Sequence, residues 1–414
     1  MNFQVNRRQA LGAGAAVVLP ATARAEPSDW VGAWRAAEQP ALPGKAPRFA
    51  SQTLRLILPL HLGGRSLRVR LSNRYGREPL RIAAARVAVR REGSAIEPET
   101  DRELPLPALI APGEAAWSEA LELPLAGRVD LALSLYLEAP QEIGTVHLLA
   151  MQTSYLAAGD QTAAATLTQA QPLHAWPAMV GVDVQGSGGG AVMAFGSSHV
   201  DGDGIAPDRR ERFGDQLSQR LHALGHPTAV LNYGLIGNRL RFDSPTDRRN
   251  PVGPAFGEAG LRRFARELDD AHGATAVILC TSINDIGLPG VWTGLQELPR
   301  PEDLLQGYLQ LAAQARARGL RVLISNLSPF ENADVAPGYW TPRKEGLRRA
   351  FNRLLAQHAA GFDALLDFDA SGRDPRHRSR LRPEFDSGDH LHPNAAGYAA
   401  RAALVPLEPL RART

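Results

Sequence analysis

The stretch that decides the fold is Ala191-Val192-Met193-Ala194-Phe195 followed by Gly196-Ser197-Ser198-His199-Val200-Asp201-Gly202. A short apolar run that ends in glycine and serine is typical of a buried strand followed by a turn. In a parallel α/β sheet, ligands bind at the carboxyl ends of the strands. We therefore expect the polar loop after Phe195 to belong to a site.

The same rhythm continues to the end of the chain. Further apolar runs lie at 228–231, 276–280, 322–325 and 364–367, and helical patterns lie at 208–224, 257–268, 302–318 and 342–359. Gly225 and Gly319 follow two of these patterns, where a left-handed cap residue is expected. Strands that alternate with helices indicate a parallel sheet covered on both faces. We predict a three-layer α/β/α domain with a parallel sheet over residues 190–414.

The first half of the chain has a different period. Between Trp30 and Gln185 the sequence consists of short apolar runs and turn signals, and residues 67–71 alternate strictly between apolar and basic side chains. Such alternation is typical of half-buried antiparallel strands. We predict an all-β sandwich domain, jelly-roll-like, over residues 28–185, joined to the second domain by a glycine-rich linker at 185–190.

The first residues indicate export. Arg7 and Arg8 precede an apolar run from Leu11 to Pro20, which is followed by Ala23-Arg24-Ala25. This order predicts a twin-arginine-like signal peptide over residues 1–25 and a periplasmic or extracellular protein. The apolar run is too short for a stable membrane anchor.

Composition excludes several classes of protein. The 414 residues are enough for two domains, and 44% of them are hydrophobic, as in ordinary globular proteins. Lys and Arg number 46 against 43 Asp and Glu, so no basic surface for nucleic acid is predicted. Cys280 is the single cysteine, which rules out an intrachain disulfide and a cysteine metal site. We expect it to be a small buried hydrophobe.

Four polar clusters follow the apolar runs or lie near the end of the chain. They are Gly196–Gly202, Asn232–Arg239, Thr281–Gly287 and Asp386–Asn394. Each alone is more typical of a turn or a helix cap than of a site. Together they supply a serine, oriented amide donors and an Asp-x-x-His, which are the groups that a serine nucleophile requires.

In this order the clusters resemble blocks I, II, III and V of the SGNH (GDSL-like) hydrolases, over about residues 191–398. The first half is also similar to the β-domain of some secreted bacterial members. The resemblance implies a catalytic triad of Ser198, His392 and Asp389. It implies an oxyanion hole formed by the Ser198 N–H, the Gly234 N–H and the Asn284 amide. Neither a cofactor nor a metal is implied.

The function that the resemblance implies is an exported serine esterase. It would hydrolyse carboxylic esters through an acyl-enzyme, with short acyl groups on a small molecule or a polysaccharide, such as carbohydrate acetyl esters, as its substrates. The alternatives are a lipase or arylesterase with the same site and a catalytically weakened, carbohydrate-binding protein. The last is motivated by Ser197 and Val200, which stand where the family usually has aspartate and threonine. Ser282 likewise stands where a glycine is usual.

Other residues have two interpretations. His390 and His392 with Asp386 and Asp389 also suit a zinc site. Trp292, Tyr339 and Trp340 form an aromatic wall of the site or serve as packing. We expect residues 373–382 to form a solvated basic face. His147 and Tyr155 are candidates to reach the site from the β half.

Overall fold

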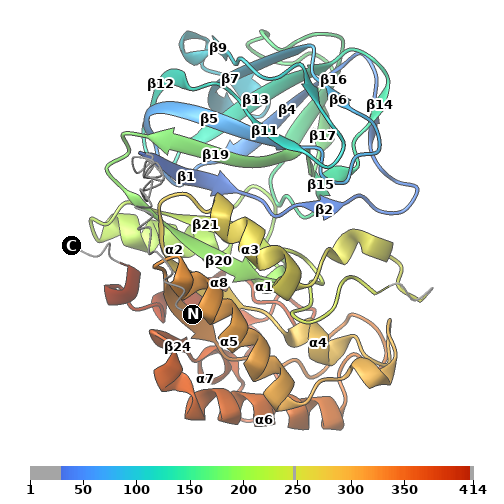
Figure 1. Ribbon diagram of the computed structural model, residues 1–414, viewed down its shortest axis with the longest axis vertical. Helices are drawn as coiled ribbons and strands as arrows, with labels where there is room; N and C mark the ends of the chain where they lie inside the picture. Colours follow the sequence, from blue (N-terminus) through green and yellow to red (C-terminus); the bar gives the residue numbers. More distant parts are fainter. Residues whose placement is uncertain (1–28, 246–248, 411–414) are drawn as a thin grey trace, which may run out of the picture.

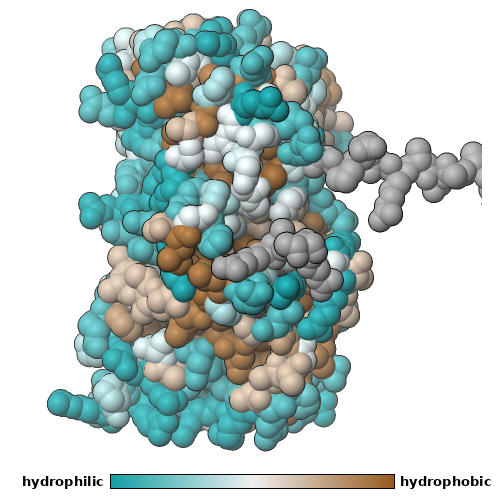
Figure 2. All heavy atoms as spheres, turned by 90° about the vertical axis from the view of Figure 1, so that its left-hand side faces the viewer, coloured by the Kyte–Doolittle hydropathy of each residue, from teal (hydrophilic) through white to brown (hydrophobic). Residues whose placement is uncertain are grey.

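The computed structural model describes residues 29–245 and 249–410, so the predicted signal peptide lies outside the described residues. An all-β half, at the top of Figure 1, stands on an α/β half. None of the described helices is both long and apolar enough to span a membrane. The two ends of the molecule are mostly hydrophilic, and apolar side chains gather between them on the face drawn in Figure 2.

The all-β half is a sandwich of two antiparallel sheets. The first sheet contains β1 (Trp30–Arg35), β19 (Met179–Gln185), β5 (Gly64–Ser72), β11 (Ala115–Trp117) and β12 (Leu121–Leu125). The second contains β17 (Gln171–Leu173), β16 (Ser154–Ala158), β4 (Gln52–Pro59), β13 (Asp130–Leu137), β7 (Ala84–Glu92), β8 (Ala95–Ile96) and β9 (Arg102–Glu103). Short ladders at the edges are β10 (Leu109–Ile110) with β6 (Leu80–Arg81), β14 (Gln141–Glu142) with β3 (Arg48–Phe49), and β18 (Trp176–Pro177) with β15 (Thr145–His147) and β2 (Gln39–Pro40).

The period-two pattern explains the core of the sandwich. Leu67, Val69 and Leu71 of β5 are fully buried against the same core as the alternate leucines of β4. The other face of β4 is covered as well, because the buried Arg55 donates hydrogen bonds to the carbonyls of Ser94 and Ala164. A loop is thereby held over this face, which is why β4 is buried on both sides.

The α/β half has the predicted parallel sheet. Its strand order is β21 (Thr228–Gly234), β20 (Gly190–Gly196), β22 (Ala274–Cys280), β23 (Arg321–Ser325) and β24 (Ala364–Leu366). Met193 and Phe195 pack toward α3 (Gly260–Asp270), α5 (Pro301–Ala317) and α6 (Pro342–Gln357). Val192 and Ala194 point to the opposite face, which is covered by α2 (Phe213–Ala223), α7 (Phe368–Gly372) and α8 (Ala395–Ala403). The sheet therefore forms the middle layer of three.

Short helical segments complete the chain. The two α-helices not yet named are the short α1 (Ser198–Asp201), which follows β20, and α4 (Ile283–Gly287), which follows β22. The 3-10 helices are η1 (Pro98–Thr100), η2 (Gly253–Phe256), η3 (Leu295–Glu297), η4 (Ala359–Gly361), η5 (Pro383–Phe385) and η6 (Glu408–Leu410). The predicted left-handed caps are confirmed, since Gly225 and Gly319 have φ of 75° and 79°. Cys280 is free and buried as expected, and burial raises the pKa of its thiol to about 11.

The second half differs from the prediction at two helix starts. The helix predicted from residue 208 begins at Phe213, because the Asp208 carboxylate accepts hydrogen bonds from the N–H and the hydroxyl of Thr153 in the β half. The first turn of α2 is closed by Asp215, whose carboxylate accepts a hydrogen bond from the Arg212 N–H. Likewise, the helix predicted from residue 257 begins at Gly260.

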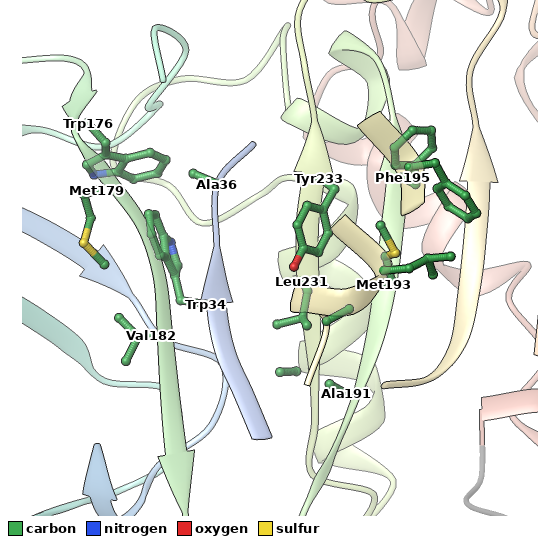
Figure 3. Packing of buried hydrophobic residues seen from close by; sticks show 14 of the residues in the cluster. Trp34, Ala36, Trp176, Met179, Val182, Ala191, Met193, Phe195, Leu231 and Tyr233 are labelled. Carbon is green, nitrogen blue, oxygen red and sulfur yellow. The ribbon is translucent and has the colours of Figure 1, made fainter. Parts of the chain in front are cut away.

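The two halves share one continuous apolar core. Figure 3 shows Trp34, Trp176 and Val182 of the sandwich on one side of β1 and Leu231 and Tyr233 of the α/β sheet on the other, and all five belong to the same buried cluster. β1 crosses close to the start of β22, where the Gly32 N–H donates to the His272 carbonyl at 3.0 Å. We call this contact region between the halves the seam.

Candidate active site

The candidate nucleophile lies at a strand-to-helix turn. β20 ends at Gly196, Ser197 is extended, and Ser198 is the first residue of α1. A Cβ at Gly196 would lie 2.0 Å from the Cys280 carbonyl oxygen, so only glycine allows the turn to pack against β22. The turn places Ser198 at the carboxyl edge of the sheet, as the sequence predicts.

The structure brings the three predicted triad residues together. Ser198 Oγ lies 2.8 Å from His392 Nε2, and His392 Nδ1 lies 2.5 Å from Asp389 Oδ2. Ser198 and His392 are buried, whereas about a third of the Asp389 side chain is exposed. The contacts form a continuous path for a proton from the hydroxyl to the imidazole, with a carboxylate that orients the ring.

The Asp389 carboxylate is strongly stabilised. Its Oδ1 accepts hydrogen bonds from the N–H groups of Leu391 and His392 and from the Ser387 hydroxyl. Burial alone would raise the pKa of Asp389, but its interactions with His392 and these N–H groups hold the pKa well below the ordinary value. Asp389 is therefore ionised whenever His392 works as a base.

The predicted donor Asn284 is held in a defined orientation. Asn284 lies on α4, where its Oδ1 accepts a hydrogen bond of 2.8 Å from the Tyr339 hydroxyl. Its Nδ2 donates one hydrogen to the Asn238 carbonyl at 3.0 Å, which leaves the second hydrogen for another acceptor. The Ser198 N–H, the second predicted donor, has no hydrogen-bond partner among the described residues.

The assignment of the third donor to Gly234 does not fit the structure. The Gly234 N–H already donates to Asn232 Oδ1 at 2.8 Å. Gly234 is a glycine for another reason, since a Cβ there would lie 2.1 Å from the Asp201 nitrogen. Its role is to let the end of β21 pack against α1.

The contacts favour Gly237 in place of Gly234. Within residues 234–238 of the described structure, the N–H of Gly237 alone lacks a partner. Gly237 has φ of 69°, and the next carbonyl, that of Asn238, holds the Asn284 amide. The pattern of glycines could not distinguish Gly234 from Gly237, because the difference depends on which N–H groups are already bonded.

The departures from the family pattern have structural explanations. Ser197 Oγ is buried and has no partner among the described residues, so this hydroxyl adds no hydrogen bond to the loop of the nucleophile. Val200 is buried in the core beneath α2. Ser282 has φ of 83°, a backbone conformation that glycine adopts without strain.

Two residues beside the triad were missed by sequence reasoning. Asp203 Oδ2 lies 3.7 Å from His392 Nε2, on the side that faces Ser198, and burial raises the pKa of this carboxyl. The His199 ring contacts the Leu391 carbonyl at 3.0 Å and lies edge-on to His392. Burial keeps the pKa of His199 well below its ordinary value, so a neutral ring supports the loop of His392. A single sequence carries no signal for either role.

The alternative metal cluster separates into two pairs. His390 Nδ1 faces Asp386 at 2.6 Å, whereas His392 faces Asp389 and Ser198. Within residues 29–245 and 249–410, no group of three or more His, Cys, Asp or Glu side chains is arranged to hold a metal ion.

The aromatic candidates have three different roles. Tyr339 is buried and orients Asn284, as described above. Trp292 packs on Phe256. Trp340 lines a groove of about 610 Å³ beside the catalytic loop, together with Asn332, Asp334 and His390.

The other candidates lie apart from the triad, with one exception. Tyr155 packs on the outer face of the sandwich and does not reach the site. In the basic stretch at 373–382, three arginines form ion pairs, namely Arg373 with Asp369, Arg380 with Glu331 and Arg382 with Glu384. The exception is His147, whose Nε2 lies 2.9 Å from Asp201 at the end of α1.

Comparisons with known proteins agree with this fold. The model of the GDSL-like lipase/acylhydrolase family matches residues 194–400, half of the chain. The solved structures that the chain resembles include TesA, with 22% identity over 53% of this chain and 99% of that one and a TM-score of 0.36. They also include the aryl esterase of M. smegmatis, with 19% identity, 52% and 95% coverage and a TM-score of 0.39. AlinE4, an SGNH-hydrolase family esterase, has 22% identity, 50% and 88% coverage and a TM-score of 0.34. No curated protein matches the chain.

The match covers the end of the strand that precedes Ser198, the turn at 234–238, Asn284 and the loop of Asp389 and His392. The chain belongs to the GDSL-like lipase/acylhydrolase family, the SGNH hydrolases, and is a carboxylic ester hydrolase.

Proposed function

We propose that the protein is an exported serine esterase that removes short acyl groups, such as acetyl groups, from a hydroxyl-rich alcohol through an acyl-enzyme on Ser198. The observation that carries this proposal is the unbroken contact chain from Ser198 Oγ through His392 to Asp389, at 2.8 Å and 2.5 Å. Export rests on the signal-peptide pattern of residues 1–25 alone.

In the first step, His392 Nε2 takes the proton of Ser198 as Oγ bonds to the ester carbonyl carbon. The electron pair of the C=O bond moves to the oxygen, and the N–H groups of Ser198 and Gly237 and the Asn284 amide donate to that oxyanion. Removing one such donor typically costs about 2.7–4 kcal/mol of barrier. Asp389 accepts a hydrogen bond from the Nδ1–H of His392 throughout, and that proton stays on the ring.

In the second step, the C–O bond to the alcohol breaks as His392 returns its proton to the departing oxygen. Water then enters and loses a proton to His392, and its oxygen bonds to the acyl carbon. Collapse of this second intermediate releases the acid and restores the Ser198 hydroxyl. Asp203 Oδ2 lies 3.7 Å from His392 Nε2, the atom that carries the transferred proton in both steps.

The groove beside the catalytic loop supports a polar alcohol as leaving group. Asn332, Asp334 and His390 offer polar atoms there, and Trp340 offers an aromatic surface. The loop that lines the groove is tied to the site, because the Asp334 N–H donates to the Asp389 carbonyl at 2.8 Å. A groove of this composition suits an alcohol rich in hydroxyl groups better than a lipid chain.

The test is hydrolysis of p-nitrophenyl esters from acetate to palmitate and of an acetylated oligosaccharide. Ser198→Ala is expected to lower kcat by at least about 10⁴-fold, because the nucleophile is lost. The proposal further expects kcat/KM to fall from acetate to palmitate. Folded wild-type protein that turns over no ester, and whose Ser198 does not react with a fluorophosphonate, would favour the carbohydrate-binding alternative. A preference for palmitate would favour a lipase.

A further inference from the structure

We propose that His147 of the β-sandwich, acting through Asp201, is a positioning residue for the active site. In this view the sandwich holds the nucleophile helix and the oxyanion turn in register with each other. The inference rests on the proposed function of Ser198. It goes beyond that function because it assigns the N-terminal half a part in catalysis.

The contact between His147 and Asp201 is buried and well defined. His147 is the last residue of β15, and its ring stacks on Trp176 with the ring centroids 5.5 Å apart. Its Nδ1 lies 3.0 Å from the Ala37 carbonyl oxygen, and its Nε2 lies 2.9 Å from Asp201 Oδ1. The exposed fractions of the two side chains are 2% and 0%. The ring is thus held on both nitrogens and one face.

These contacts require a proton between His147 and Asp201. The Ala37 carbonyl is only an acceptor, so Nδ1 donates to it. Nε2 of the same ring and Asp201 Oδ1 lie at hydrogen-bond distance, so one proton must lie between them. The pair is therefore a hydrogen bond with little access to water, which holds its partners in a more defined geometry than an exposed ion pair.

Asp201 connects this hydrogen bond to both parts of the site. Its backbone N–H donates to the Ser197 carbonyl at 3.0 Å and closes the single turn of α1 that begins at Ser198. Its second carboxylate oxygen, Oδ2, accepts from the Ile236 N–H at 2.9 Å. One side chain thus joins the helix of the nucleophile to the turn of Gly237.

The same turn reaches Asn284. The Asn238 carbonyl accepts from the Asn284 amide, so a shift of residues 236–238 would move two oxyanion donors relative to Ser198 Oγ. Misplacement of a reacting group by about 1 Å can lower a rate about 100-fold. Ser197, which could have tethered the loop locally, has no hydrogen-bond partner for its hydroxyl among the described residues. Asp201 and His147 supply the missing tether.

The seam offers a matched control. His61 of the sandwich lies 2.9 Å from Asp215 through its Nε2, and both side chains are 9% exposed. This pair is also a buried contact between a histidine and an aspartate that joins the two halves, but Nδ1 of His61 accepts a hydrogen bond from the Val230 N–H, whereas Nδ1 of His147 faces a carbonyl. However, the Asp215 carboxylate caps α2 through the Arg212 N–H and does not contact α1 or the turn at 234–238.

The experiment compares His147→Gln with His61→Gln in the full-length protein. We expect both substitutions to lower the melting temperature by similar amounts. His147→Gln should lower kcat for p-nitrophenyl acetate about 10- to 100-fold with KM changed less than about twofold, because transition-state contacts are lost. His61→Gln should keep kcat within about twofold of wild type. Asp201→Asn should act like His147→Gln, and the double variant should be little worse than either single variant.

Equal losses of kcat in the two histidine variants, or an unchanged kcat in a destabilised His147→Gln, would overturn the proposal. The wild type and Ser198→Ala measured in the same assay show separately whether the serine mechanism holds. Hydrogen exchange of residues 197–202 and 234–238 gives a readout without turnover. Faster exchange of both segments in His147→Gln, but not in His61→Gln, is expected, and unchanged exchange in His147→Gln counts against positioning.

Discussion

The seam contains two sets of buried contacts: His147 meets Asp201, and Arg35 meets Asp183 and Asp270. We call the second set the distal end, because none of its hydrogen bonds or ion pairs among the described residues reaches the triad. Both contacts are buried and involve aspartate side chains, and both pair groups far apart in sequence. Asp201 accepts a hydrogen bond from the Ile236 N–H and is the last residue of the helix that begins at Ser198. Among the described residues, the distal end has more ion pairs, but its side chains do not bond to Ser198, Asp389 or His392.

The distal end is a network of charges around one aromatic ring. Arg68 and His272 also pair with Asp183, and Arg70 also pairs with Asp270. Arg35, Arg68 and Arg70 lie against the Trp117 ring. The comparison teaches that two buried contacts of this kind differ in what the carboxylate bonds next: Asp201 bonds the turn at 234–238, whereas Asp183 and Asp270 bond side chains of their own network.

The largest effect is expected from Arg35→Met at the distal end. Arg35 is 1% exposed, and its removal leaves Asp183 and Asp270 short of a buried partner. We expect the free energy of unfolding to fall by about 3–5 kcal/mol, as when one partner of a buried pair is lost. Urea denaturation measures this loss, while kcat of the folded enzyme should stay within about twofold of wild type.

A control for this variant is Arg48→Met, which removes an exposed ion pair with Glu142. Its effect on stability should be below about 1 kcal/mol. If kcat of Arg35→Met dropped as much as that of His147→Gln, the distinction between the Arg35 contacts and the His147 contact would not hold.

A smaller effect is expected from His61→Gln in acid. Burial alone would raise the pKa of Asp215, but the hydrogen bond and charge of His61, with Arg212 and Arg210, lower it to about 2 from 3.8. Because the folded state binds the proton less tightly, this carboxyl stabilises the fold above pH 4. That contribution, about 2 kcal/mol, is lost as the pH falls from about 4 to 2.

In His61→Gln the pKa of Asp215 should lie closer to its ordinary value, so most of the stability that the wild type loses between pH 4 and pH 2 should already be absent. Urea denaturation of the wild type and the variant at pH 4.5 and pH 2.5 measures the difference in acid sensitivity. The two proteins should differ more at pH 4.5 than at pH 2.5. An equal difference at both pH values would show that His61 does not set the charge state of Asp215.

The smallest effect is expected from Tyr339→Phe, which tests an anchor inside the α/β half. The Tyr339 hydroxyl donates to Asn284 Oδ1, so its loss lets the amide turn. We expect kcat to fall about tenfold at constant KM, equivalent to about 1.4 kcal/mol. Tyr233→Phe removes a buried hydroxyl that is bonded to Asp270 at the distal end, and it should leave kcat within about twofold of wild type. Equal kcat in the two variants would show that Asn284 needs no hydroxyl to orient it.

Much of the fold was predictable because it depends on local pattern. The period-two alternation of residues 67–71 predicts antiparallel strands with one buried face. The alternation of apolar runs with helical patterns after residue 190 predicts a parallel sheet between two layers of helices. The gathering of Ser198, the turn at 234–238 and Asn284 follows as well, since the carboxyl ends of parallel strands lie at one edge of a sheet.

What the sequence by itself determined is therefore the class of each half, the edge of the sheet that carries the site, and which polar residues gather there. The tertiary structure alone decided that α2 begins at Phe213, that Gly237 rather than Gly234 keeps a free N–H, and that His147 reaches Asp201. The physical reason is the distance along the sequence over which each kind of interaction acts. Periodicity and turn chemistry act within a few residues, whereas a buried hydrogen bond pairs groups 54 residues apart, and its partners become known only when the two halves are packed together.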